Sequence, residues 1–541
     1  MYDAAAPTST LELIDTSTDA PSQSDQMRAE LSPTRHRSSP PVPPPRHLPR
    51  LGEKELHIAP MLDVSTREFR YFMRLLTKRS VLWTEMVVAE TLRHCNEADY
   101  DLHLAFEHDP RTDNGTAHPI VCQIGGNVPD EAAFATRLVH RYGYDRIDLN
   151  AECPSDRVTG RREFGAALMK DVDTAVDMVK AMVQTAEDCG KGGNYDNGHG
   201  EGHTLPVSVK TRIGVDDNDT IEFLLDYIGR LVKAGCRSFI IHARKVYTKG
   251  LSPAQNRSVP PLNYHKVYAL CEAFPHCTFW LNGGLRSLVD ARRVAYGAAI
   301  TGFSEDRNAI LKENDIEDGA PCELCQPHGI APSPHLSPSN LHGVMLGRLA
   351  MDNPCAFADV DRYFFGQERN PCRTRRDLIE RYATWVERVY PRRCCDDDPA
   401  VTLGRSLGVE HIPRVRNCCP VCREYYGEEK ENPCIDDGLD EGTTVGDAVN
   451  NSQYAMSQVR HRRHARKCPG AKMVSSVIDR PLKPVLGVFF GQKGNANFRR
   501  ELHRLSRDMN VRNCGPGYIL RKSIEVVSPE VLDQEFAKCD C

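Results

Sequence analysis

The chain has 541 residues, of which 40 % are hydrophobic and 26 % charged, as is typical of a soluble globular protein. Lys and Arg number 69 against 74 Asp and Glu, a net charge of −5 that excludes a uniformly basic nucleic-acid binder but allows a local basic face. No apolar run approaches the ~20 residues of a membrane helix, so we expect no membrane association. The 21 cysteines are too few for a disulfide scaffold, which needs about 8 % of the residues.

Residues 1–50 have the composition of a disordered tail. They hold nine prolines and many Ser and Thr residues, without the apolar periodicity that a packed core requires. The first 30 residues carry six acids and a single Arg, unlike a mitochondrial transit peptide, and no apolar secretory segment follows. We therefore expect a cytoplasmic protein with reduced thiols, and leave the nucleus and the organelles open.

Short apolar runs begin at residue 55 and alternate with longer stretches of helical periodicity. Runs that are apolar at nearly every position are typical of strands buried on both faces of a sheet. The eight runs are Leu56–Pro60, Val81–Met86, Ile120–Ile124, Arg146–Asn150, Val207–Thr211, Phe239–His242, Thr278–Asn282 and Val344–Leu346. Helical patterns between them include Glu131–Arg141, Asp173–Thr185 and Thr220–Ala234. This alternation predicts a (β/α)8 TIM barrel of the α/β class, with a doubly wound sheet as the alternative.

Three stretches interrupt this pattern, and a further helical segment follows the barrel. The interruptions at 189–203, 302–341 and 391–475 are interpreted as loop insertions. Helical spacing at Thr374–Glu387 and Asn497–Met509 predicts a smaller C-terminal helical domain, divided by the third insertion. The predicted division is a tail at 1–50, a barrel at 51–365, a helical domain at 366–510 and a C-terminal tail at 511–541.

Polar residues follow the predicted strands, where the active sites of such barrels lie. Gly283, Gly284, Gly347 and Arg348 follow the last two strands and suit a phosphate group, because glycine lets backbone amides approach an anion. Lys210 and His242 follow the fifth and sixth strands and are suited to a flavin ring. Each of these residues taken singly could also be an ordinary strand end.

Cys153 lies just after the fourth strand, at the predicted mouth of the barrel. A thiol at that place could act as a nucleophile or a proton donor, since its ordinary pKa near 8.5 leaves it protonated at neutral pH. Inert packing is the alternative, because most buried cysteines have no chemical role.

Several short stretches, most of them at predicted strand ends, form one ordered pattern along the chain. The stretches are Ile58-Ala-Pro-Met61, Thr84-Glu85-Met86, Asn150-x-x-Cys153-Pro-Ser-Asp-Arg-Val158, Val209-Lys-Thr-Arg-Ile-Gly214, His242-Ala-Arg-Lys245, Gly250-Leu-Ser-Pro253 with Arg257, Asn282-Gly-Gly284, Gly347-Arg348 and Gly487-Val-Phe-Phe-Gly-Gln492. Together they resemble the tRNA-dihydrouridine synthases, specifically the A branch of that family. The resemblance covers roughly residues 55–187, 205–300, 343–390 and 478–505.

The resemblance implies flavin-dependent reduction of uridine to 5,6-dihydrouridine in tRNA, in the D-loop near position 20 or 20a. NADPH would reduce FMN, the flavin would pass hydride to C6 of the uridine, and Cys153 would protonate C5. Asn150, Arg257 and Arg499 would contact the tRNA, whose target base must leave the stack. FMN would be held by Pro60, Met61, Gln123, Lys210, His242, Asn282, Gly283, Gly284, Gly347 and Arg348.

Two positions depart from the family pattern. Glu152 stands where the family usually has Gly, directly before Cys153, so its carboxylate could raise the thiol pKa or obstruct the loop. Ala496 replaces an Arg that the family favours, which removes one expected tRNA contact.

The insertions contain further cysteines and basic residues. Cys419, Cys422, His464 and Cys468 have zinc-ligand spacing at both ends, but the interval between the two pairs is far longer than in ordinary fingers. Cys322 and Cys325 are a further pair, and we favour free thiols over a zinc site. A basic run suits phosphate contacts or a solvated loop, and consists of Arg460, Arg462, Arg463, Arg466 and Lys467.

Two alternatives to a monomeric tRNA-dihydrouridine synthase stay open. A flavin barrel acting on a small pyrimidine would leave the C-terminal helical domain without a purpose. A tRNA-binding protein with little turnover would follow if Glu152 disables the site.

Overall fold

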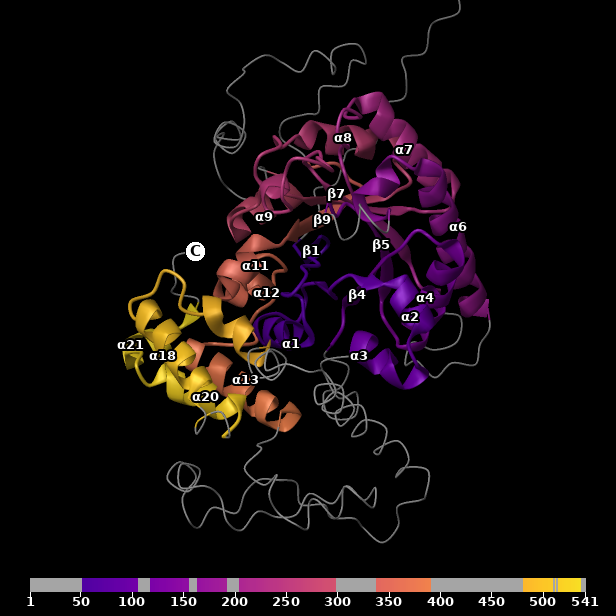
Figure 1. The fold of residues 1–541 in the computed structure, drawn as a ribbon. Coiled ribbons are helices and arrows are strands. Elements are labelled where there is room, and N and C mark those ends of the chain that lie inside the picture. Colours follow the sequence, from indigo (N-terminus) through magenta and orange to yellow (C-terminus); the bar gives the residue numbers. More distant parts are fainter. Residues whose placement is uncertain are drawn as a thin grey trace, which may run out of the picture. The chain divides into compact units, whose positions relative to one another are not determined.

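A computed structural model of the protein describes residues 51–105, 117–154, 163–191, 204–297, 337–390, 480–508, 511 and 514–536. Parallel strands form a sheet in the order β1-β9-β8-β7-β6-β5-β4-β2, with helices around it (Figure 1). The strands are β1 (Glu55–Ile58), β2 (Leu82–Trp83), β3 (Val87–Val88), β4 (Ile120–Gly125), β5 (Arg146–Ala151), β6 (Val207–Arg212), β7 (Ser238–His242), β8 (Thr278–Asn282) and β9 (Leu341–Leu346). A parallel bridge between His57 and Val81 joins β1 to the chain entering β2, which confirms the predicted barrel.

The second predicted strand, Val81–Met86, is divided into the short strands β2 and β3. Both pair with β4: Leu82 lies opposite Ile120, and Val87 lies opposite Ile124. Four steps along β4 therefore correspond to five along its partner, so one extra residue bulges out between them. At this bulge the Thr84 hydroxyl accepts a hydrogen bond from the backbone amide of Gln123 at 3.1 Å.

Helices follow most strands and cover the outside of the barrel. They are α1 (Arg67–Leu76), α2 (Ala89–His94), α3 (Tyr100–Leu104), α4 (Pro129–Arg141), α6 (Val172–Lys191), α7 (Ile221–Lys233), α8 (Tyr264–Ala273), α9 (Leu288–Tyr296), α11 (Arg348–Asp352) and α12 (Val360–Tyr363). The predicted helices Glu131–Arg141, Asp173–Thr185 and Thr220–Ala234 are confirmed as α4, α6 and α7. The Thr220 side chain caps α7 by accepting from the Phe223 amide, which explains where this helix begins.

Among the described residues, four further α-helices form a C-terminal group, drawn in orange and yellow in Figure 1. They are α13 (Arg375–Val389), α18 (Asn495–Arg507), α20 (Pro516–Ile524) and α21 (Pro529–Leu532). The sequence predicts a tail from residue 511, whereas α20 packs against α13 and joins it through an ion pair between Arg521 and Glu380 at 2.8 Å. A helix of nine residues is too short to show a clear period, so tertiary packing decides its structure. The remaining domain boundaries stay predictions.

Several predicted features lie wholly or mostly outside the described residues. They are the tail at 1–50, the insertions at 189–203, 302–341 and 391–475, the basic run, and the zinc candidates Cys419, Cys422, His464 and Cys468. Within the described ranges, no helix is long and apolar enough to cross a membrane. The same ranges contain no cluster of three or more potential metal ligands.

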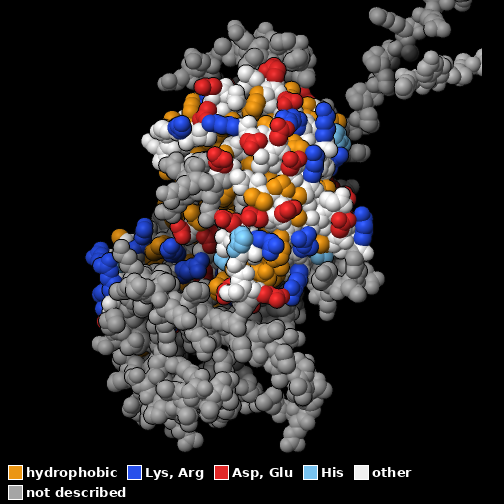
Figure 2. Space-filling model, turned by 45° about the vertical axis from the view of Figure 1, so that its right-hand side comes forward, with side chains coloured by type: hydrophobic (Ala, Val, Ile, Leu, Met, Phe, Trp, Pro, Cys, Tyr) orange, Lys and Arg blue, Asp and Glu red, His pale blue; other side chains and the backbone are white. Residues whose placement is uncertain are grey.

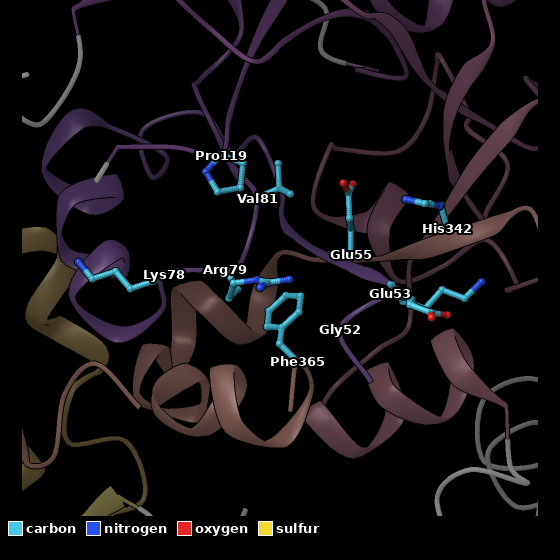
Figure 3. A pocket seen from close by; sticks show the side chains of 10 residues that line it. Gly52, Glu53, Glu55, Lys78, Arg79, Val81, Pro119, His342 and Phe365 are labelled. Carbon is cyan, nitrogen blue, oxygen red and sulfur yellow. The ribbon is translucent and has the colours of Figure 1, made fainter. Parts of the chain in front are cut away.

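A cavity of about 300 Å³ opens at the N-terminal ends of the strands (Figure 3). It lies beside Glu55 at the start of β1, Pro119 just before β4 and His342 near the start of β9. The polar residues predicted for function follow the opposite, carboxyl ends of the strands. The cavity is therefore separate from the candidate site, as expected for a barrel whose chemistry lies at the C-terminal face.

Gly343 provides a test of the barrel's packing. It lies in β9 opposite Glu55, and a Cβ at this position would come within 2.0 Å of the Glu55 carbonyl oxygen. We expect Gly343→Ala to lower the free energy of unfolding in urea by about 3 kcal/mol, because the clash is with backbone. Gly229→Ala in α7 is the matched control: its Cβ would meet Phe274 at an ordinary 3.6 Å, so stability should hold or rise. Equal effects of the two changes would contradict the register of β1 and β9.

Candidate active site

The predicted site residues of the barrel lie in the carboxyl-terminal halves of its strands or just beyond them. Gln123, Asn150, Lys210, His242 and Asn282 are each at most 8 % exposed. Strand register places Asn150 beside Lys210, and His242 beside Asn282. Parallel strands thus bring residues far apart in sequence to one end of the barrel, as predicted.

Lys210 is the centre of a buried polar cluster. Its ammonium group pairs with the Glu152 carboxylate and donates a hydrogen bond to Asn282 Oδ1 at 3.3 Å. Asn282 is held in turn because its Nδ2 donates to the Met345 carbonyl at 2.9 Å. The second oxygen of Glu152, Oε2, lies 3.4 Å from His242 Nδ1. Glu152 therefore joins two side chains that the sequence assigns to a flavin.

Charges in this cluster follow from burial and from these contacts. Burial by itself would raise the pKa of Glu152, but the Lys210 ammonium group and the nearby His242 ring hold it well below its usual range. Burial and the nearby Arg212 guanidinium lower the pKa of His242, so its ring is neutral at pH 7. The cluster thus combines a carboxylate, an ammonium group and a neutral imidazole.

A chain of hydrogen bonds leads from the barrel interior to Cys153. Gln123 Nε2 donates to Asp148 at 2.9 Å, and Asn150 Nδ2 donates to Gln123 Oε1 at 3.0 Å. Asn150 Oδ1 then accepts from the backbone amides of Glu152 at 3.3 Å and Cys153 at 3.1 Å. The orientation of the Asn150 amide therefore fixes the start of the Cys153 loop.

Asp148 belongs to this chain, and the sequence prediction did not include it. It is fully buried in β5, and the Ser208 hydroxyl donates to it at 2.7 Å. Burial raises its pKa to about 8, although the hydrogen bonds from Gln123 and Ser208 favour the charged form. The available signal is an acidic residue in the middle of a strand predicted to be buried on both faces, which is costly unless hydrogen-bonded.

Asn150→Ala tests whether this chain positions Cys153. The change removes the acceptor for two backbone amides, so we expect any turnover that depends on the Cys153 thiol to fall by about 10- to 100-fold through its misplacement. Asn150→Asp keeps an acceptor for both amides and should lose less. Steady-state assays of both variants provide the measurement. Equal turnover of wild type and Asn150→Ala would refute this role.

Glycines form close turns after β8 and β9. Gly283 and Gly284 have φ values of 110° and 76°, which favour glycine. A Cβ on Gly283 would come within 2.8 Å of the His242 ring, and one on Gly347 within 3.4 Å of the Met61 sulfur. Pro60 and Met61, just after β1, are half-buried, while Arg348 is exposed at the start of α11. The missing side chains of Gly283 and Gly347 thus let the His242 ring and the Met61 sulfur lie close to the backbone at this end of the barrel.

Cys153 differs from most of the other described cysteines. Seven of the ten are buried, whereas Cys153, Cys95 and Cys189 are partly exposed. Burial raises the pKa of the Cys122 and Cys236 thiols to about 12, which makes them inert. Of the three partly exposed thiols, Cys153 is the one that directly follows a barrel strand.

The two arginines predicted to contact tRNA lie on different parts of the molecule. Arg257 is exposed in the short turn η3 (Gln255–Arg257), after β7. Arg499 is exposed on α18, in the C-terminal group, together with Arg500, Arg504 and Arg507. The side of α18 opposite these arginines is buried through Phe498, Leu502 and Leu505. Figure 2 shows Lys and Arg side chains interspersed with Asp and Glu over the visible face, so this face is not uniformly basic.

Sequence comparison identifies the relatives of this chain. The family model described as "Dihydrouridine synthase (Dus)" matches residues 57–303. A protein of Vibrio vulnificus named "tRNA-dihydrouridine(20/20a) synthase" is 35 % identical over 333 residues, which are 61 % of this chain and 80 % of the relative. An Escherichia coli O6:H1 protein of the same name is 38 % identical over 310 residues, 57 % of this chain and 72 % of the relative. With relatives matched over most of their length, the chain belongs to the dihydrouridine synthase family of enzymes.

Proposed function

We propose that this protein reduces uridine to 5,6-dihydrouridine in tRNA, with FMN as its bound cofactor and NADPH as its reductant. The relatives' name, tRNA-dihydrouridine(20/20a) synthase, suggests a uridine at position 20 or 20a. The observation that carries the proposal is that the half-buried Cys153 loop and the buried Lys210 stand at the same end of the barrel, on strands that pair at Asn150.

The residues at the strand ends fit a flavin mononucleotide. A buried ammonium group beside a neutral imidazole suits the polar edge of the ring, which gains negative charge on reduction. The positive-φ turn at Gly283 and Gly284, with exposed Arg348, suits the phosphate. Pro60, Met61, Gln123, Asn282 and Gly347 would complete this site. Once bound, FMN would supply the hydride.

Side chains of the protein would supply the proton and would bind the tRNA. Cys153 would donate its thiol proton to C5 of the uridine, on the face opposite the flavin. Asn150 would hold the Cys153 loop through two backbone amides, besides contacting the base. Arg257 near the barrel mouth and Arg499 on α18 would bind tRNA phosphates, so binding should weaken as salt rises.

Incubation with NADPH, FMN and unmodified tRNA tests this function. Nucleoside mass spectrometry should show uridine converted to dihydrouridine, far faster in tRNA than with free uracil. Equal rates with free uracil would favour a barrel that acts on a small pyrimidine. Flavin binding without formation of dihydrouridine would overturn the proposal. The ion pair between Glu152 and Lys210 favours one other function, a tRNA binder with little turnover, which would shift tRNA in a gel but not consume NADPH.

A further inference from the structure

Glu152 places a negative charge where the proposed cofactor site needs positive charge. Its carboxylate pairs with Lys210, whose side chain is only 2 % exposed, and reaches to 3.4 Å from His242 Nδ1. Glu152 Oε2 is itself buried and completes no hydrogen bond with the described residues. One oxygen of the carboxylate, Oε1, is thus paired with Lys210, whereas the other, Oε2, accepts no hydrogen bond from the described residues.

The backbone of this loop does not depend on the Glu152 side chain. The Glu152 and Cys153 amides bond to Asn150, and the Cys153 carbonyl accepts from the Ala166 amide at 3.0 Å. Removing the carboxylate should therefore leave Cys153 in place. An effect of such a change on the cofactor would come from the charge and volume of Glu152.

We propose that Glu152 competes with FMN for Lys210 and His242, so that it weakens FMN binding and lowers the reduction potential of the bound flavin. This inference rests on the proposed function and adds a residue that tunes the cofactor. A flavin gains negative charge on reduction, and an adjacent ammonium group stabilises that charge. A carboxylate already paired with the same ammonium group offsets the stabilisation, and it does so strongly where water is excluded.

Two substitutions separate charge from volume. Glu152→Gln keeps the size of the side chain and removes its charge, whereas Glu152→Ala removes both. Glu97→Gln is the matched control: Glu97 pairs with Arg141 on the surface, and its side chain is 74 % exposed. Circular dichroism and thermal unfolding would establish that each full-length variant is folded.

FMN affinity and the reduction potential of the bound flavin are the two readouts. For Glu152→Gln we expect the ratio of reduced to oxidised FMN affinity to rise about tenfold, a shift of about +30 mV for a two-electron couple. Glu152→Ala should shift the potential similarly and also tighten binding of oxidised FMN, because space is freed. Glu97→Gln should match the wild type in both readouts.

Unchanged affinity and potential in both folded Glu152 variants would overturn the inference, as would weaker binding or a lower potential. Failure of the proposed function would look different, because the wild type, the control and both Glu152 variants would all lack flavin absorbance after incubation with FMN and removal of the free FMN by gel filtration. FMN binding by the Glu152 variants but not by the wild type would support the inference in its strongest form.

Discussion

Cys153→Ala is expected to lower turnover of tRNA uridine by about 10²–10⁴ while FMN stays bound, because a positioned general acid contributes that much. The thiol follows β5 directly, and its loop is fixed by Asn150 Oδ1 at 3.1 Å from the Cys153 amide. Alanine keeps this backbone contact, so the variant removes the proton donor alone. Dihydrouridine formation and the flavin absorbance of one sample provide the two measurements.

Cys189→Ala is the control for this experiment. Cys189 is also partly exposed, but it lies on α6 and does not follow the carboxyl end of a strand. Its replacement should leave turnover unchanged. Normal turnover in Cys153→Ala would show that another group, or water, donates the proton.

Lys210→Met is expected to have the largest effect on stability and to abolish FMN binding. It leaves the buried Glu152 carboxylate without its counter-ion, and breaking a buried pair in this way costs about 3–5 kcal/mol. Urea unfolding of the wild type and the variant gives the difference. Lys180→Met, which removes an exposed partner of Asp177 on α6, should cost less than about 1 kcal/mol.

The double variant Lys210→Met/Glu152→Gln tests the reason for this loss. It removes both charges and should recover part of the stability lost in Lys210→Met. Lowering the pH should weaken the same stabilising contribution of Glu152. The pKa of Glu152 is depressed in the folded state, so its contribution is present above the unfolded value of about 4.3 and is lost as the pH falls further. The cost of Lys210→Met should therefore shrink below about pH 4. If the double variant is no more stable than Lys210→Met, the stability lost in Lys210→Met does not come from an unpaired, buried Glu152 charge.

The barrel could be predicted from the sequence because its strands are buried on both faces. Such strands are continuous apolar runs, and β4 to β8 lie within one residue of their predicted bounds. The second strand was harder, since the bulge between β2 and β3 depends on how Thr84 meets Gln123 on the neighbouring strand. Pairing across strands is tertiary, and a single run of residues does not reveal it.

The candidate site could be predicted in position but not in its internal contacts. Lys210, His242 and Asn282 are predictable because they lie at or near the carboxyl ends of barrel strands. That Glu152 would turn toward Lys210 depends on the register of β5 against β6, which places Asn150 beside Lys210. Asp148 is not predicted, because its link to the site is a hydrogen bond from Gln123, which lies 25 residues away in the sequence.

The most direct measurement mixes the NADPH-reduced protein with unmodified tRNA in the absence of oxygen. If the strand-end cluster holds a flavin that reduces uridine while Cys153 supplies the proton, flavin absorbance should recover as an equal amount of dihydrouridine appears. In Cys153→Ala, the same recovery should be slower by about 10²–10⁴. Flavin that stays reduced in the wild type after tRNA is added would contradict the account.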